Sequence, residues 1–151
     1  PMDLKKWQDS LGSDYILLMR AHYEVSKVMS ISENEFVRDM TDYHNLNELF
    51  IASDILISDY SSVFFDYSIT GKPMLHFTYD YDTYSSKRGM YFDIREYLSG
   101  AETEDKLISL IKDMNEQIER DKTICFRDEY VSFYGNAAVK AADRISELIK
   151  R

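Results

Sequence analysis

The sequence predicts an α/β domain in which a mostly parallel sheet is covered by helices on both faces. Short apolar runs of strand length occupy residues 15–19, 55–57 and 74–77, and segments of helical period lie between and after them. Strands that alternate with helices are typical of parallel sheets. The 151 residues, 44% of them hydrophobic, suffice for one domain with a substantial core.

Four elements are expected before the centre of the chain: a helix over residues 3–12, a strand over 15–19, a strand over 36–40 and a helix over 46–52. In the first helix, apolar residues recur at helical spacing until Gly12 ends the pattern. The uninterrupted apolar run at 15–19 suits a strand covered on both faces. Asn45 is a candidate N-cap, and Glu48 completes a capping-box pattern. Residues 23–32 fit either a loop or a short helix.

The centre of the chain is a strand, a serine-rich turn and a helix. The strand leads into the polar turn at residues 58–62, and a run that is apolar nearly all round follows, as in a buried helix. Ser61 or Ser62 is a suitable N-cap for this helix. Gly71 suits the left-handed position after the helix, and Pro73 prevents the helix from continuing.

This turn is the first candidate for a binding site. In an open α/β sheet it lies at the carboxyl edge of the strands, where ligands bind. Free amides and serine hydroxyls at a helix N-terminus favour an anion such as phosphate. Because capping serines are common, a capped helix without a ligand is the alternative interpretation of the turn taken alone.

The second half of the chain contains a strand over residues 74–77, a structured loop over 78–92 and two helices. The loop is expected because this tract is rich in tyrosine and aspartate. Thr103 is a candidate N-cap for a helix that runs to about Glu119. The last helix follows Gly135 and Asn136, and an apolar face is expected to point inward. This face consists of Val139, Ala142, Ile145, Leu148 and Ile149.

Composition excludes several classes of partner. The net charge of −9 argues against binding of nucleic acid or of an anionic membrane by bulk electrostatics. No apolar run approaches the ~20 residues that span a bilayer, and no signal peptide is expected. The single cysteine, Cys125, forms no internal disulfide and suits a reducing compartment. We expect Cys125 to be a small buried or neutral residue rather than a nucleophile.

Few side chains suggest metal binding. The sequence has no Cys/His spacing of a metal site, no glycine-rich phosphate loop and no nucleophile elbow. Asp80 and Asp82 are weak candidates for Mg²⁺ ligands. His76, flanked by apolar residues, is interpreted as a core histidine, and His44 as a surface residue.

Charged residues near the predicted strand ends are further candidates. Arg20 and His22 follow the strand at 15–19 and, two residues apart, point to the same side. Arg20 suits either a phosphate or a salt bridge, and His22 either chemistry or a structural contact. Arg88 followed by Gly89 is a second phosphate clamp or a solvated loop charge. Asp66 either binds a sugar or glycerol hydroxyl or complements the helix dipole.

Taken together, these motifs resemble those of the CDP-glycerol glycerophosphotransferase family, the teichoic acid polymerases and primases of Gram-positive bacteria. The resemblance covers about residues 15–149. Its motifs, in order, are Arg20-x-His22, Ser58-Asp59-Tyr60-Ser61-Ser62-x-x-x-Asp66, Lys72-Pro73 and Arg88-Gly89-x-Tyr91-Phe92-Asp93. Two segments depart from the family pattern, at residues 98–101 and at Gly135-Asn136, and leave the nucleotide and the polyol undecided.

The resemblance implies a GT-B architecture of two Rossmann-like domains that face each other across a cleft. Residues 1–151 then correspond to the C-terminal, donor-binding domain, a single Rossmann-like domain. Because the chain begins Pro1-Met2, without an initiator methionine, we expect a fragment of a longer two-domain enzyme. The implied reaction transfers glycerol phosphate from CDP-glycerol to a hydroxyl of a teichoic acid chain or lipid-linked primer, with release of CMP.

The resemblance also implies roles for individual residues. His22 matches a histidine required for activity, and a second histidine, the proposed general base, belongs to the N-terminal domain. Ser61 and Ser62 match positions that contact the donor pyrophosphate. The remaining expected substrate-binding residues, which lie in the same motifs, are Arg20, Ser58, Asp59, Asp66, Arg88 and Gly89. No metal ion or cofactor is implied.

Other functions remain open on the sequence alone. A GT-B transferase that uses CDP-ribitol or a nucleotide sugar shares the pyrophosphate site and differs beyond it. A non-catalytic interaction domain that retains the fold is the alternative from another class. The acceptor chain or primer is expected to bind through the N-terminal domain. We expect a cytoplasmic protein, peripheral at the inner face of the membrane, with the membrane contact outside this chain.

Overall fold

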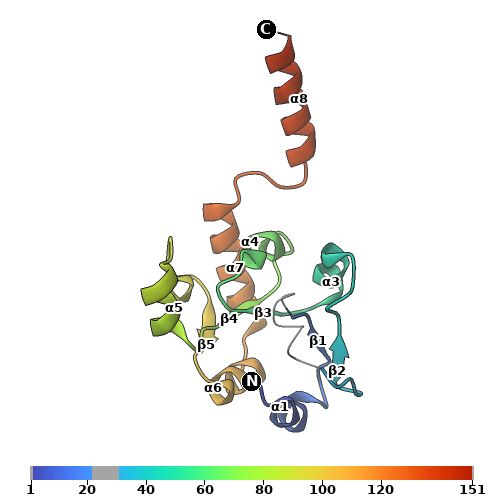
Figure 1. Ribbon diagram of the computed structural model, residues 1–151, viewed down its shortest axis with the longest axis vertical. Helices are drawn as coiled ribbons and strands as arrows, with labels where there is room; N and C mark the ends of the chain where they lie inside the picture. Colours follow the sequence, from blue (N-terminus) through green and yellow to red (C-terminus); the bar gives the residue numbers. More distant parts are fainter. Residues whose placement is uncertain (1, 22–30, 151) are drawn as a thin grey trace.

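The computed structural model describes residues 2–21 and 31–150 (Figure 1). Helices and strands alternate along much of the described chain. The helices are α1 (Leu4–Leu11), α3 (Leu46–Ala52), α4 (Val63–Ser68), α5 (Tyr81–Arg88), α6 (Glu104–Lys112), α7 (Glu116–Tyr130) and α8 (Ala137–Ile149), with a 3-10 helix, η1 (Ile94–Glu96). The strands are β1 (Leu17–Met19), β2 (Val37–Asp39), β3 (Leu56–Ser58), β4 (Met74–Phe77) and β5 (Ser99–Ala101).

All strand pairs in the described chain are parallel. Strands β1 and β2 form one pair, with Leu17 opposite Val37, and β3, β4 and β5 form a three-stranded sheet in that order. Ser58 at the end of β3 lies opposite His76, and His76 lies opposite Gly100. The parallel arrangement places the ends of neighbouring strands at one edge, so the segments after β3 and β4 leave the sheet side by side.

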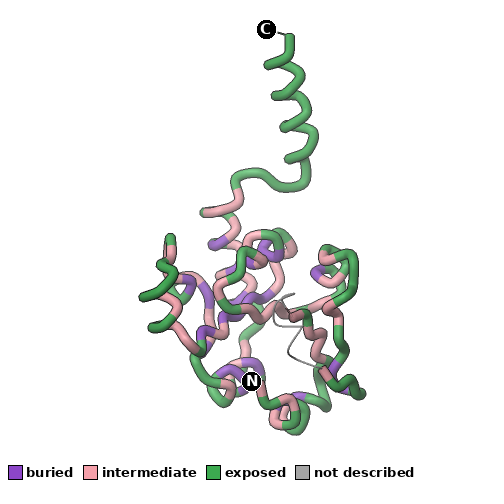
Figure 2. Tube along the Cα trace, in the orientation of Figure 1, coloured by how far each residue is buried: buried purple, intermediate pink, exposed green. Residues whose placement is uncertain are grey.

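The sheet is buried on both faces, as predicted. Met74 and Leu75 are adjacent on β4, fully buried, and belong to different hydrophobic clusters, because successive strand residues point to opposite faces. One cluster joins α1 and α6 to strands of both sheets: Trp7, Leu11, Phe36, Val37, Leu75, Ala101, Leu107, Ile108 and Ile111. The other joins α3, α4 and α7: Phe50, Phe64, Tyr67, Met74, Ile94, Leu98 and Phe126. Figure 2 shows this buried layer between the two groups of helices.

Several predicted elements are confirmed. Helix α1 buries Trp7 and Leu11, strands β1 to β4 lie where the apolar runs predicted them, and helices α3 and α4 follow the predicted caps. Gly71 has the expected left-handed backbone, with φ of +64°. Asn45 is the N-cap of α3, as predicted, but the predicted capping-box hydrogen bonds were wrong. Asn45 makes no side-chain cap bond and instead donates its Nδ2 to Glu48 Oε1 at 2.9 Å.

The prediction of a structured loop at residues 78–92 was wrong, because this segment contains helix α5. Sequence patterning could not show this helix, since none of its residues is buried and it has no apolar stripe. The prediction also missed β5, whose three residues include a glycine. The sequence Ser99-Gly100-Ala101 carries little strand propensity, and pairing with β4 determines its conformation.

The single helix predicted from Thr103 to about Glu119 was also wrong. Helix α6 ends at Lys112, and Asn115 begins α7 by accepting a hydrogen bond from the amide of Ile118 at 3.3 Å. The break carries the chain from the face that α6 covers to the face that α7 covers. Ile118, in the first turn of α7, is 50% exposed.

Helix α8 does not point its apolar face inward. It projects away from the rest of the chain in Figure 1, and every described residue from 132 to 150 is exposed. The periodicity predicted the helix and its apolar face correctly, but it carries no information about what the face packs against. Among the described residues, nothing covers it.

We predict that Gly100→Ala destabilises the domain by more than about 2 kcal/mol, because overpacking against backbone has no cheap relaxation. A Cβ at residue 100 would lie 2.1 Å from the carbonyl oxygen of His76 and 2.4 Å from its ring. Urea unfolding measures the effect. Gly135→Ala is the matched control: it has φ of +75° but nothing within 4 Å, so it costs only backbone strain. Equal losses in both variants would contradict the role given to Gly100.

Candidate functional site

The serine turn connects β3 to α4 at the carboxyl edge of the sheet. Ser58 is the last residue of β3 and is half-buried, whereas Asp59, Ser61 and Ser62 are exposed. Ser61 Oγ accepts a hydrogen bond from the amide of Val63 at 3.3 Å. Ser62 occupies the N-cap position without a side-chain cap bond. The turn therefore presents two exposed serines, one of which already serves the first turn of the helix.

Tyr60 joins this turn to helix α5. Its ring stacks on the ring of Tyr84, with centroids 3.8 Å apart and planes inclined by 14°. Its hydroxyl donates to Asp80 Oδ1 at 3.1 Å, immediately before α5. Burial and then the carboxylate of Asp80 raise the pKa of Tyr60 above its usual value, so the hydroxyl stays protonated and remains a donor.

Helix α5 carries Arg88 at its last position and ends at Gly89. Gly89 has φ of +68°, a conformation that favours glycine, and Arg88 and Gly89 are both exposed. Tyr84 and Arg88 are four residues apart and share a helix face, with Cβ atoms about 6 Å apart. The structure thus places Arg88 one turn beyond the ring that stacks on the serine turn.

The N-terminal end of α5 is attached to the segment before β5. Tyr81 donates its hydroxyl to Asp93 Oδ2 at 2.8 Å. Arg95 donates to the same carboxylate at 2.8 Å and to Glu102 at 3.2 Å, and its guanidinium lies 3.3 Å from the centre of the Tyr81 ring. The hydrogen bonds from Arg95 hold the pKa of Asp93 at about 2, below its usual value of 3.8.

Arg20 follows the end of β1 and belongs to a second group of contacts, separate from those of the serine turn and α5. Its Nη1 donates to the carbonyl oxygens of Met40 and Tyr43 at 3.1 and 2.6 Å, so it fixes the segment that follows β2. Among the described residues, Arg20 forms no salt bridge to a carboxylate, which was one of its two predicted interactions. No hydrogen bond or ion pair in this part of the chain joins Arg20 to the serine turn. His22, the proposed catalytic residue, lies outside the described residues, as does most of the segment 23–32.

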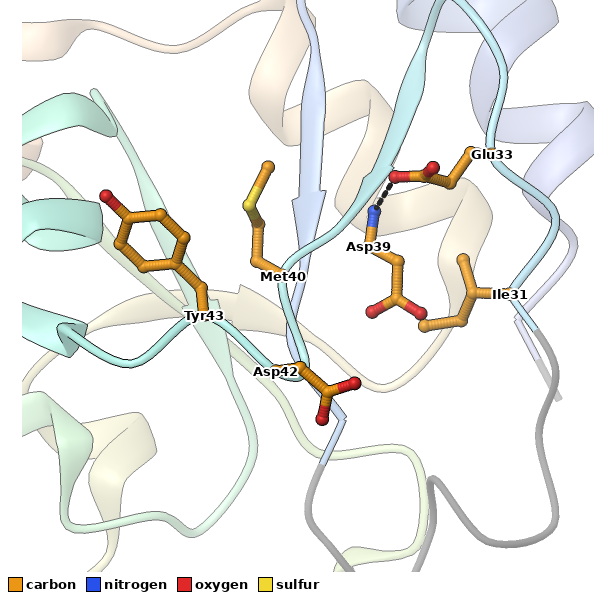
Figure 3. A pocket seen from close by; sticks show the side chains of 6 residues that line it. All are labelled: Ile31, Glu33, Asp39, Met40, Asp42 and Tyr43. Atoms are coloured by element: carbon orange, nitrogen blue, oxygen red, sulfur yellow. Dashed lines mark hydrogen bonds between the residues drawn. The ribbon is translucent and has the colours of Figure 1, made fainter.

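A hollow of about 430 Å³ lies beside this second group (Figure 3). It is lined by Ile31, Glu33, Asp39, Met40, Asp42 and Tyr43. Glu33 accepts a hydrogen bond from the amide of Asp39 at 2.9 Å. The side chain and amide of Thr41 lower the pKa of Asp39. The described lining carries three carboxylates and disfavours an anion.

A second, smaller hollow of about 200 Å³ lies beside the start of α5. Its lining is also acidic and consists of Tyr79, Asp80, Tyr81, Asp82, Thr83 and Glu102. No group of three or more His, Cys, Asp or Glu side chains with metal-binding geometry occurs within residues 2–21 and 31–150. The weak suggestion that Asp80 and Asp82 hold Mg²⁺ thus receives no geometric support, and Asp80 accepts from Tyr60 instead.

Other predicted residues lie as follows. Asp66 is exposed in the first turn of α4, where it complements the helix dipole. His76 is a core histidine, as expected: it is 5% exposed, its Nδ1 lies 3.1 Å from Thr78 Oγ1, and burial lowers its pKa. His44 is exposed, as expected. Cys125, expected to be either buried or neutral, is exposed, so the first of these alternatives was wrong.

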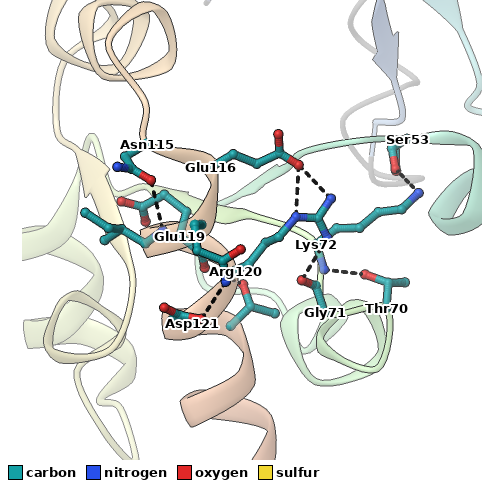
Figure 4. A network of polar contacts seen from close by, with 12 residues as sticks. Ser53, Thr70, Gly71, Lys72, Asn115, Glu116, Glu119, Arg120 and Asp121 are labelled. Atoms are coloured by element: carbon teal, nitrogen blue, oxygen red, sulfur yellow. Dashed lines mark hydrogen bonds and ion pairs between the residues drawn. The ribbon is translucent and has the colours of Figure 1, made fainter.

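Lys72, part of the Lys72-Pro73 motif, has a structural role. Its Nζ donates to the carbonyl oxygens of Ile51 and Ser53, both at 2.7 Å, and so satisfies the C-terminal end of α3 (Figure 4). Arg120 of α7 donates to the carbonyl oxygen of Gly71 at 3.3 Å. These contacts lie before β4, at the edge of the sheet opposite the serine turn.

Comparison with known proteins identifies the family. The model of the family described as CDP-Glycerol:Poly(glycerophosphate) glycerophosphotransferase matches residues 1–150. The chain belongs to this family. The resemblance noted from the motifs is thereby confirmed.

Two curated relatives show how much of a family member the chain represents. It is 36% identical to the teichoic acid poly(glycerol phosphate) polymerase of Bacillus subtilis strain 168, over 98% of this chain and 20% of that protein. It is 33% identical to the teichoic acid poly(ribitol-phosphate) polymerase of Bacillus spizizenii, over 98% of this chain and 24% of that protein. The chain therefore spans a quarter or less of the length of these relatives.

The fold is likewise similar to that of a solved structure. The structure of the wall teichoic acid polymerase TagF matches with a TM-score of 0.83 at 35% identity, over 98% of this chain and 38% of that one. The α/β class with parallel strands flanked by helices is confirmed. In the described part of the chain, no helix is both long and apolar enough to cross a bilayer.

Sequence reasoning missed Tyr60, Asp80 and Tyr84 as parts of the site. Tyr60 lay inside the serine motif, but a tyrosine between polar residues gives no signal of its stacking partner 24 residues later. The tyrosine-rich tract was the available signal, and its spacing on a helix was not recognised because the tract lacks an apolar stripe.

We predict that Asp93 makes stability pH-dependent in acid. Its pKa in the folded protein, about 2, is below the unfolded value of 3.8, so its contribution is present above pH 4 and is lost as the pH falls to 2. The expected loss is about 1–2 kcal/mol of unfolding free energy. Urea unfolding between pH 5 and pH 2 measures it, and Asp93→Asn removes this part of the slope. Asp143→Asn, on exposed α8, is the control; an Asp93→Asn profile parallel to the unmodified one would contradict the assignment.

Proposed function

We propose that this chain is the donor-binding part of a transferase that moves glycerol phosphate from CDP-glycerol to a hydroxyl of a teichoic acid chain or its lipid-linked primer. The observation that carries the proposal is the family match over residues 1–150. Crystals of a histidine-to-asparagine variant of TagF soaked with CDPG, 36% identical over 98% of this chain, support the choice of donor. The proposed arrangement is the C-terminal half of a two-domain GT-B enzyme.

The serine turn is the proposed site of the donor pyrophosphate. Ser61 and Ser62 are exposed at the carboxyl edge of the sheet, and Ser58 and Asp59 form the first part of the same turn. Hydroxyls and amides there offer donors to phosphate oxygens. Arg88, next to Gly89 at the end of α5, supplies the positive charge that the acidic hollows lack.

In the proposed reaction, the acceptor hydroxyl oxygen forms a bond to the phosphorus of the glycerol phosphate. The bond from that phosphorus to the oxygen of CMP breaks, and CMP leaves with the electron pair. The hydroxyl proton passes to a base, which the resemblance places outside this chain. Donors directed at the phosphate oxygens stabilise the charge in the transition state. His22 and Arg20 are proposed to act at this step, and Asp66 to bind a glycerol hydroxyl.

CDP-ribitol is the second candidate donor, because the chain is 33% identical to a poly(ribitol-phosphate) polymerase over nearly its whole length. The two donors share the pyrophosphate and differ in the polyol. The acceptor chain or primer is proposed to bind outside this chain. The net charge of −9 argues against nucleic acid as a partner. The whole enzyme is proposed to be cytoplasmic and peripheral at the inner face of the membrane, with the membrane contact made outside this chain.

We predict that the chain binds CDP-glycerol and CMP in calorimetric titrations more tightly than UDP-glucose, and that Ser61→Ala/Ser62→Ala weakens CDP-glycerol binding by about ten-fold or more. Two lost hydrogen bonds to a charged group account for this size. Without the rest of the enzyme, binding is expected to be weak and turnover absent. Competition with CDP-ribitol then distinguishes the two polyols.

The double variant Ser109→Ala/Ser146→Ala is the matched control, because both serines are exposed on helices away from the turn. It should bind as the unmodified chain does. Binding that is equal for all three nucleotides, or that survives loss of Ser61 and Ser62, would contradict the assignment of the turn.

A further inference from the structure

We propose that Tyr60, Tyr84 and Asp80 form a clasp that holds the serine turn at a fixed position relative to Arg88. The clasp is defined by the stacked rings of Tyr60 and Tyr84 and by the hydrogen bond from Tyr60 to Asp80. These are positioning residues, since they act through Ser61, Ser62 and Arg88. The clasp rests on the proposed function in one respect, the assumption that the positioned groups bind the donor pyrophosphate.

The two contacts restrain the Tyr60 ring in different directions. A centroid separation of 3.8 Å with planes 14° apart fixes the height of the ring above Tyr84. The bond to Asp80 Oδ1 at 3.1 Å fixes its rotation and sideways displacement. A ring held at both its face and its hydroxyl also restrains the backbone on either side of it.

Neighbouring residues of the turn cannot provide this restraint. Asp59, Ser61 and Ser62 are exposed, and Tyr60 is the one residue among 59–62 that is half-buried. The side-chain attachment of the turn is therefore to α5 rather than to the sheet beneath it.

Helix α5 in turn depends on few contacts. It has no buried residue, so no hydrophobic face holds it on the sheet. The clasp attaches one side, and Tyr81 with Asp93 and Arg95 attaches its first turn. Removing the clasp leaves the end of the helix that carries Arg88 without its attachment to the turn.

The separation that matters is between the serine hydroxyls and the guanidinium. Ser61 follows Tyr60 directly, and Arg88 lies one helical turn beyond Tyr84 on the same face. A charge and two hydroxyls that act on one pyrophosphate must keep their spacing, because misplacement by about 1 Å weakens catalysis up to 100-fold. The sheet sets where the two segments start, and the clasp restrains the spacing beyond that point.

The test compares Tyr84→Ala with Tyr84→Phe in the chain 1–151. We expect Tyr84→Ala to weaken binding of CDP-glycerol by about ten-fold, and Tyr84→Phe, which keeps the stack, to bind within about two-fold of the unmodified chain. Tyr130→Ala is the control, because Tyr130 also stacks, on Phe92, and bonds to Tyr97, but lies on α7. It should lower the melting temperature and leave the affinity unchanged.

A second readout is independent of any ligand. Amide hydrogen exchange at residues 59–63 and 85–89 should become faster by ten-fold or so in Tyr84→Ala, and stay unchanged in Tyr84→Phe. Unchanged exchange in Tyr84→Ala overturns the clasp. If exchange is faster in Tyr84→Ala but the unmodified chain binds no nucleotide, the clasp is supported and the proposed function is overturned. Faster exchange with unchanged affinity in Tyr84→Ala overturns the positioning role.

Discussion

The structure depends on the burial of the parallel strands β3, β4 and β5 on both faces. Met74 and Leu75 point into opposite clusters, and each cluster needs its own helices to exclude water. Close pairing of β4 with β5 is possible because Gly100 leaves room for the backbone and ring of His76. The register Leu56–Met74 and Leu75–Ser99 follows from this packing and fixes where each strand ends.

The candidate site is a consequence of that register. Because the strands end at one edge, the turn after Ser58 and the segment after Phe77 emerge side by side, and α5 lies close enough for Tyr84 to stack on Tyr60. The sheet positions the start of each segment, and polar and aromatic contacts position the rest. The described lining of both hollows is acidic, so an anionic donor is expected at the serines and Arg88 rather than in either hollow.

Sequence patterns predicted the elements that hydrophobic burial determines. Trp7, Leu11 and the strand residues around Leu75 have spacing that reveals a buried face. Helix α5 and strand β5 could not be predicted in this way, because one lacks buried residues and the other obtains its shape from β4. The serine turn, Arg20 and Arg88 were found from motifs. The structure groups the serine turn with α5 and places Arg20 against Met40 and Tyr43. Both groupings depend on contacts between residues far apart in the sequence, which no local pattern encodes.

The donor is proposed to bind where the serine turn meets the end of α5. Backbone amide chemical shifts of the chain, followed by NMR during titration with CDP-glycerol, test it residue by residue. We expect the largest changes at residues 58–63 and 87–89. Largest changes at residues 39–43, beside the acidic hollow of Figure 3, would contradict it.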